Sequence, residues 1–199
     1  MSESVVVSAS ITIARPRLRA FLAAPVTPSA AWAEQEWAGI CDPWSDGGER
    51  HRYRAELPAA IAECDSWIDG DYASLLCELA DGEGGLTFCF DDATGSLAVN
   101  FSSRVDFRLP TLVWAFTVLR GVTAFMADDD SGLVSVDVDW NGDTALMRLG
   151  PDRSSFIDSR REPEAGAEAR SRALDVRWAA SDADEGEPAT EIVARLLGR

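Results

Sequence analysis

Apolar and polar residues alternate in four runs along the chain, and each run has one apolar face. The runs cover residues 5–13, 86–91, 97–101 and 134–140. A period of two is typical of strands that bury one side against a core and expose the other. The sequence therefore predicts several strands, and the short gap between the second and third runs predicts a hairpin.

The strongest hairpin signal is Asn141-Gly142, which follows the last of these runs and precedes another alternating run, residues 143–149. Asn and Gly tolerate the positive φ that a two-residue turn requires, so this pair predicts a tight turn between two strands. Such a turn places Val138 opposite Ala145 and gives the two strands a common apolar face.

Helical spacing, with apolar residues at every third or fourth position, separates the strands. The segments that show it are residues 16–22, 29–39, 58–68, 72–80, 109–126 and 189–197. Residues 42–54 contain Pro, Asp and Gly and are expected to be a loop. Residues 158–172 have little apolar content and are expected to be a loop or a solvated helix.

Residues 173–180 alternate again and are expected to return as an edge strand, with one apolar face made by Leu174, Val176 and Trp178. An acidic linker near residues 182–188 would then lead to the terminal helix. Strands and helices in this order predict an α+β fold in two layers. We expect one domain over residues 1–199, with an antiparallel sheet of about five or six strands and helices on one face.

The chain carries 34 acidic and 18 basic residues, for a formal net charge of −16. Such a surface would repel nucleic-acid phosphates and anionic membranes, so neither is expected as a partner. Two windows contain acids but no basic residue, between Arg54 and Arg104 and between Arg120 and Arg148. Two interpretations stay open: a solvated surface that favours solubility, or a face that docks a basic partner.

Nothing at the start of the sequence has the basic and then apolar character of a secretory signal. The four cysteines have no C-x-x-C pairing, and reduced, buried thiols in a cytoplasmic protein are expected. The longest apolar stretch, residues 109–127, contains Pro110 and Arg120. It is therefore predicted to be a core helix and not a membrane span.

The sequence has no recognisable pattern of catalytic, cofactor-binding or metal-binding residues. Residues 137–142 match the start of an EF-hand calcium loop, but the twelfth position is Arg148 where a Glu is required. His51 is the one histidine and has no nucleophile beside it. Trp44 lies on a loop between acids, which is typical of an anchor for a basic partner, although packing onto the core is the alternative. We expect no cofactor and no metal.

Residues 86–150 contain a hairpin, a long helix and an Asn-Gly hairpin, in that order. In this and in its general acidity the chain resembles the immunity proteins of bacterial polymorphic-toxin systems. The resemblance implies a cytoplasmic, non-catalytic α+β protein that binds and neutralises a cognate toxin. It also implies that carboxylates replace the toxin's anionic substrate or cover its site.

We expect a partner-binding face that includes the loop tryptophan and acids of both windows. Its members are Trp44, Asp91, Asp92, Asp137, Asp139 and Asp143. The alternatives are an adaptor or secretion chaperone, which would bind an apolar segment, and an enzyme of unrecognised type, which would need a cleft with a perturbed acid or base. The oligomeric state stays open.

Overall fold

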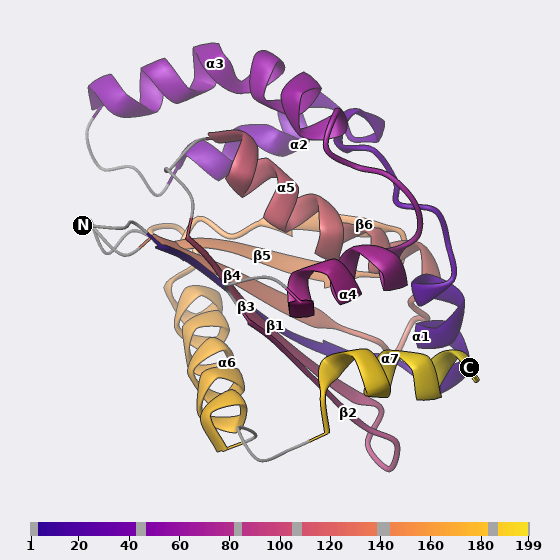
Figure 1. The fold of residues 1–199 in the computed structure, drawn as a ribbon. Helices are drawn as coiled ribbons and strands as arrows, with labels where there is room; N and C mark the ends of the chain where they lie inside the picture. Colours follow the sequence, from indigo (N-terminus) through magenta and orange to yellow (C-terminus); the bar gives the residue numbers. More distant parts are fainter. Residues whose placement is uncertain are drawn as a thin grey trace.

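Six strands form one antiparallel sheet in the computed structural model, which describes residues 4–42, 47–81, 85–104, 109–138, 144–182 and 187–198. The strands are β1 (Ser4–Thr12), β2 (Leu86–Asp91), β3 (Ser96–Arg104), β4 (Gly132–Val138), β5 (Thr144–Gly150) and β6 (Arg153–Phe156). Their order is β2-β3-β1-β4-β5-β6, so the first strand lies in the middle (Figure 1). The predicted α+β fold with a sheet of five or six antiparallel strands is confirmed.

β1 carries the alternation that makes one face of the sheet apolar. Its residues Val5, Val7, Ala9 and Ile11 are buried in the main hydrophobic core, whereas Ser8 bonds to groups on the opposite face. β3 and β4 pair with β1 along its two edges. Both sides of the β1 backbone are therefore hydrogen-bonded, as a central strand requires.

The β4–β5 hairpin has the predicted apolar face but a different register. Val136 lies opposite Ala145 and Val134 opposite Met147, two residues away from the pairing predicted for a turn at Asn141-Gly142. A shift by two residues keeps every side chain on its own face. The hydrophobic pattern is therefore compatible with both registers. Residues 139–143, which include the Asn141-Gly142 pair expected to form the turn, lie outside the described part of the chain.

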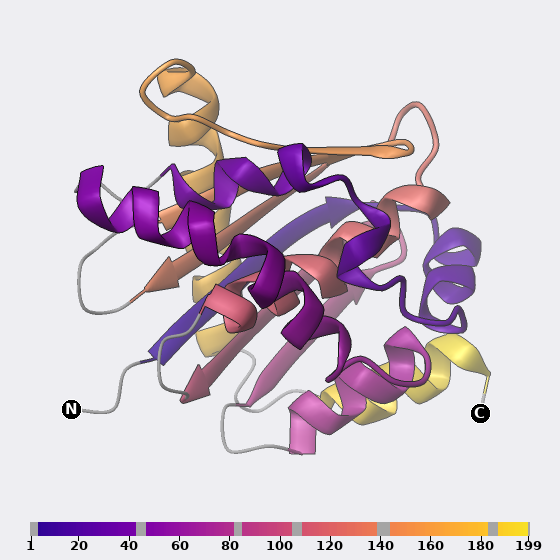
Figure 2. The same cartoon turned by 90° about the horizontal axis from the view of Figure 1, so that it is seen from above.

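Most helices cover the apolar face of the sheet. α5 (Leu109–Arg120) is buried between β4 and α3 (Gly47–Asp65), which forms the outer layer on this side (Figures 1 and 2). α1 (Arg15–Leu22), α4 (Tyr72–Asp81) and α7 (Ala189–Leu197) pack together near β2. These last three helices agree with the predicted segments.

α6 (Pro163–Asp182) lies on the opposite face, where it contacts β1, β3, β4 and β5 (Figure 1). The sheet is therefore covered on both faces, where the sequence predicted helices on one. The expected edge strand at residues 173–180 is part of this helix. Val176 is buried, whereas Leu174 and Trp178 point to solvent, because alternate residues of a helix lie on nearly opposite sides.

Two further segments differ from the prediction. Residues 29–39 are not one helix, and instead form η1 (Ser29–Ala31), α2 (Glu34–Trp37) and the start of η2 (Ala38–Cys41). Trp32 interrupts them with an extended backbone, φ −97° and ψ 139°. α3 begins at Gly47 and not near Pro58, so residues 47–54 of the predicted loop are helical. Pro58 lacks an N–H donor, yet the helix continues through it.

The predicted core helix at residues 109–126 is α5 followed by a 3-10 segment, η3 (Gly121–Phe125). Nearly all of α5 is buried, which agrees with a core position. Within the residues that the structure describes, no helix has both the length and the apolar character needed to cross a bilayer. Residues 183–186 of the expected acidic linker lie outside the described residues.

Candidate functional site

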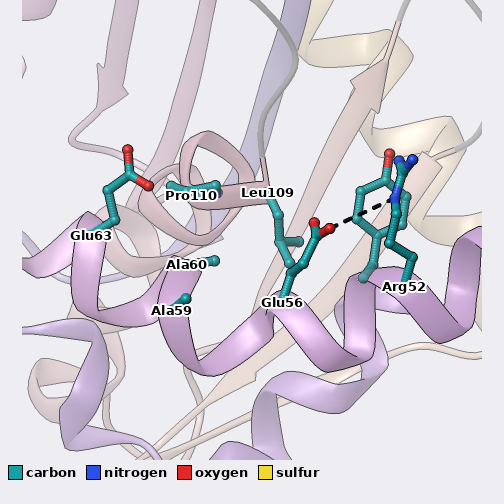
Figure 3. A pocket seen from close by; sticks show the side chains of 8 residues that line it. Arg52, Glu56, Ala59, Ala60, Glu63, Leu109 and Pro110 are labelled. Carbon is teal, nitrogen blue, oxygen red and sulfur yellow. Dashed lines mark ion pairs between the residues drawn. The ribbon is translucent and has the colours of Figure 1, made fainter.

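A cavity of about 340 Å³ runs along α3 where this helix meets the start of α5 (Figure 3). We call it the α3 groove. It has an apolar floor and charged side chains along one wall. The residues that line it are Arg52, Tyr53, Glu56, Ala59, Ala60, Glu63, Leu109 and Pro110.

Helical spacing brings the charged residues of the α3 groove to one stripe of α3. Arg52, Glu56 and Glu63 are four and seven residues apart, and residues at such spacings share one side of a helix. Tyr53 and Ala60 lie on the neighbouring stripe and are buried. The first two residues of α5 close the other side (Figure 3). The groove therefore offers apolar contact and negative charge side by side.

The Glu56 carboxylate is only weakly held within the chain. Arg52 Nε lies 3.9 Å from Glu56 Oε1, and both side chains are exposed. An exposed pair of this kind contributes about 0–1 kcal/mol. The Arg52 guanidinium also lies 4.8 Å from the centroid of the Tyr53 ring, which can keep it in place without Glu56. Glu56 can thus exchange Arg52 for an incoming cation at little cost.

The α3 groove has the side chains to bind a cation. Among the described residues that line it there is no Ser, Thr, Cys or His. His51 precedes the groove on α3 and is exposed. Across the described part of the chain, no group of three or more His, Cys, Asp and Glu residues is placed to hold a metal ion. A long cationic side chain would fit, with its aliphatic stem on the apolar floor and its charge at the carboxylates.

Two of the predicted site residues, Asp91 and Asp92, lie where β2 turns into β3. Asp91 accepts hydrogen bonds from the backbone N–H of Ala93 (2.9 Å) and the hydroxyl of Thr94 (2.7 Å). The hydrogen bonds from Thr94 and Ala93 lower the pKa of Asp91. Asp92 Oδ2 lies 2.9 Å from Arg15 Nη1. Both acids are exposed and stabilise this turn and its contact with α1.

Asp137, a third predicted residue, lies beneath α6 and is engaged within the chain. Its carboxylate accepts hydrogen bonds from the hydroxyls of Ser135 and Thr144 and forms an ion pair with Arg177 of α6. Burial lowers the pKa of Arg177. These residues fasten α6 to the sheet, so Asp137 is less free to meet a partner than the sequence suggested.

The described members of the predicted face do not share one surface. In the sheet, Asp137 of β4 lies opposite Val6 of β1. Asp91 of β2 lies opposite Ser96 of β3, which in turn lies opposite Thr12 of β1. Six residues of a strand separate Val6 from Thr12, which corresponds to about 20 Å. Trp44, Asp139 and Asp143 lie outside the described residues.

Other acids of the first window have structural roles that the sequence analysis missed. The carboxylate of Asp65 accepts hydrogen bonds from the backbone N–H groups of Ser29 (2.5 Å) and Ala30 (3.1 Å). Asp71 precedes α4 and accepts one from the N–H of Ser74 at 2.7 Å. An Asp just before a helix is a capping signal that the sequence does contain. Part of the acidity thus serves caps and turns.

Arg120 at the end of α5 is a fully buried cation. Its guanidinium lies 4.7 and 4.5 Å from the ring centroids of Trp32 and Trp37. Its Nε donates to the Ser154 hydroxyl at 2.7 Å, and its Nη2 lies 3.4 Å from Glu36 Oε1. Burial lowers the pKa of Arg120 to about 10, so the group stays charged at pH 7. The sequence signal for this role is a lone charge in an apolar helix.

The four cysteines are free thiols, and Cys41 and Cys64 are buried as expected, while Cys77 and Cys89 are only partly buried. None of them is among the described residues that line the α3 groove. Burial raises the pKa of the Cys64 thiol to about 11, despite hydrogen bonds with Ser29 and Thr117. Cys64 is therefore a protonated core residue at neutral pH and not a nucleophile.

We predict that Cys64 makes stability fall in alkaline solution. An unfolded thiol ionises near its ordinary pKa of 9.0, whereas the folded one keeps its proton up to about pH 11. The contribution of the buried, protonated thiol to stability is complete below pH 9. It is lost as the pH rises from about 9 to about 11, because in this range only the unfolded state releases the proton. Urea unfolding at pH 8 and pH 10.5 should show a smaller loss for Cys64→Ala than for the wild type; equal losses would contradict this.

The chain was compared with known proteins at the level of sequence families, individual proteins and folds. No family model, no curated protein and no solved structure matches it.

Proposed function

We propose that this chain is a non-catalytic binding protein that neutralises a basic protein, such as a cognate toxin, through the α3 groove. The observation that carries the proposal is the combination of an apolar floor with the glutamates Glu56 and Glu63 in a chain of net charge −16. A basic partner would find both contact area and charge there. The resemblance to immunity proteins supports the same function.

The recognised feature of the partner is a lysine or arginine on a protruding segment. Its methylene groups would pack on Ala59, Ala60 and Pro110, and its cationic end would lie between Glu56 and Glu63. Displacing Arg52 from Glu56 costs little, because the existing pair is long and exposed. The excess of acids elsewhere would accelerate association by steering a basic molecule toward the protein.

The acids of the originally predicted face have a different part in this proposal. Asp91 and Asp92 contribute to the long-range field from the far end of the sheet, whereas Asp137 contributes mainly to the attachment of α6. Reversing the charge of Asp137 would leave Arg177 without its carboxylate and would test folding as much as binding. The groove glutamates are therefore the better choice for a binding test.

The proposal is tested with the basic proteins encoded beside this gene, each co-expressed with the chain and measured by calorimetry. We expect one of them to bind, and its affinity to fall about tenfold or more between low and high salt, because opposite charges at an exposed interface are screened. Glu56→Arg combined with Glu63→Arg should weaken binding by about 10- to 100-fold, since two attractive contacts become repulsive.

A matched control separates the groove from overall charge. Glu78→Arg combined with Glu164→Arg produces the same change in net charge at exposed positions of α4 and α6. This control should lose only the part of the affinity that comes from steering, about threefold or less. Equal losses for the two double variants would exclude the α3 groove as the binding site. Salt-independent binding would favour the secretion-chaperone alternative.

A further inference from the structure

The outer face of α6 exposes two large apolar side chains, although this helix packs its other face on the sheet. Leu174 is 53% exposed and Trp178 is 70% exposed, the largest values among the exposed large apolar residues of the described chain. They lie four residues apart and therefore side by side on the helix. A tryptophan exposed to this extent beside a leucine is typical of an interaction surface.

These residues belong to a longer stripe with the spacing of a coiled-coil seam. Ala167, Ser171, Leu174 and Trp178 are separated by four, three and four residues, and all four are exposed. This 4-3-4 pattern is the d-a-d-a series of a heptad repeat. Its side chains become larger from Ala167 to Trp178. The stripe lies on the outer side of α6, since the inward side contains Ala169, Ala173 and Val176, and Leu174 at its edge also borders a pocket between α6 and the sheet.

Two oppositely charged residues flank the stripe, and neither has an ion pair within the described chain. In the heptad pattern Arg170 takes a g position and Asp175 the e position that follows. The neighbouring charges are already used, since Arg172 Nη2 lies 2.8 Å from Glu168 and Arg177 pairs with Asp137. Arg170 and Asp175 are thus the charges left for a partner helix.

Their placement selects a second copy of the same helix in parallel orientation. In a parallel pair a g residue faces the e residue of the next heptad on the partner, so Arg170 meets Asp175 of the other copy, twice by symmetry. In an antiparallel pair each Arg170 would meet Arg170, and each Asp175 would meet Asp175. We propose that two copies of this chain associate in parallel through the Ala167–Trp178 stripe of α6.

The pair is reversible, because the stripe is small. A buried tryptophan covers about 150–250 Å², so the two apolar side chains provide well under the roughly 800 Å² per partner of a standard interface. Dissociation constants in the range of about 10–100 μM are expected. The α3 groove lies on the far side of the sheet from α6 (Figure 1), so both grooves of the pair stay accessible. The inference does not depend on the proposed function.

Sedimentation equilibrium of the full chain from about 5 to 500 μM tests the association itself. The wild type should shift from monomer to dimer over this range, and Trp178→Glu should stay monomeric. Trp67→Glu is the matched control, because Trp67 is 43% exposed, lies beyond the end of α3 and should leave dimerisation unchanged. A monomeric wild type at the highest concentration, or equal effects of the two substitutions, would overturn the proposal.

A charge exchange tests the parallel orientation. Arg170→Asp alone and Asp175→Arg alone should each raise the dissociation constant about fivefold, because each creates like-charged pairs across the seam. The two substitutions together should restore the wild-type value. In an antiparallel pair, Arg170 faces Arg170 and Asp175 faces Asp175. Either single substitution would then only invert the sign of one like-charged pair, so it would not change the dissociation constant in this way.

Disulfide formation gives an independent readout of the same geometry. Ser171→Cys places a thiol at an a position, where equivalent residues of a parallel pair face each other within the reach of a disulfide. Mild oxidation should therefore produce a covalent dimer of this variant. Arg172→Cys, one residue outside the seam, should stay monomeric on a non-reducing gel. Crosslinking of both variants to the same extent would count against the α6 seam.

Discussion

Arg120→Ala is expected to lower the free energy of unfolding by about 3–5 kcal/mol, the largest loss that we predict for a single substitution in this chain. The guanidinium fills the space between Trp32 and Trp37 and donates to Ser154. Alanine would leave a cavity between two large rings and an unpaired hydroxyl. Urea denaturation at pH 7, monitored by tryptophan fluorescence, measures the loss.

Two companion substitutions show which part of Arg120 matters. Arg120→Met should recover much of the loss, because it fills the same space without a charge and because Nη1 of Arg120 has no hydrogen-bond partner within the described residues. Glu36→Gln should cost under about 1 kcal/mol, since that carboxylate is half exposed and distant at 3.4 Å. An Arg120→Ala protein as stable as the wild type would show that the aromatic contacts contribute nothing.

Gly121→Ala is expected to cost about 3 kcal/mol, because a methyl group at this position would overlap the hydroxyl of Tyr72. Tyr72 cannot move away easily. It is buried, its ring centroid lies 4.2 Å from that of Phe21, and its hydroxyl accepts a hydrogen bond from the backbone N–H of Thr27 at 3.1 Å. The clash must therefore be relieved by shifting α4 or the start of η3. Thermal and urea unfolding measure the result.

The control for this substitution is Gly150→Ala at the end of β5, where the nearest atom to the added methyl would be the Arg153 Nε at 3.5 Å, an ordinary contact. It should change stability by less than about 0.5 kcal/mol. Tyr72→Phe in the Gly121→Ala background removes the nearest overlapping atom but keeps the ring Cζ, which would also overlap the added methyl. The double variant should therefore lose somewhat less than the sum of the single losses, and additive losses would show that the ring alone is the obstacle.

The strands were predictable because each has one buried face whose side chains recur at a period of two. The alternation in β1 and in the β4–β5 hairpin survives in the structure, and only the hairpin register differs. Register depends on the turn, and a shift by two residues changes no face, so the hydrophobic pattern contains no information on it.

The second half of α6 was predicted wrongly for a related reason, whereas a solvated helix was one of the two expectations for its first half. The helix has few apolar residues, and Leu174, Val176 and Trp178 fit a strand pattern while in fact serving two opposite surfaces of a helix. Pro58 similarly favoured a helix start, although α3 continues through it. In both cases tertiary contacts decide between local preferences that are nearly balanced.

The candidate site was predictable only in its charge. The acid-rich window contains Glu56 and Glu63, but nothing in the sequence indicates that Leu109 and Pro110 face them across a groove, since this depends on the packing of α3 on α5. The sequence also cannot separate an acid that bonds to a distant backbone segment, such as Asp65, from acids that face solvent without a backbone partner. Counting the carboxylates in a stretch of sequence therefore overestimates how many of them are available on the surface to a partner.

The central place of β1 has a consequence for how the chain is made. β1 pairs with β3 and β4, and Val5 has its partners at Ser103 and Val138. A ribosome that adds about 5–20 residues per second therefore needs roughly 5–20 s after Val5 before Ser103 exists, and roughly 7–27 s before Val138 exists. Until β3 is made, a strand with one fully apolar face has no neighbouring strand to pair with, so β1 must be shielded from other chains for longer than the strands that follow it.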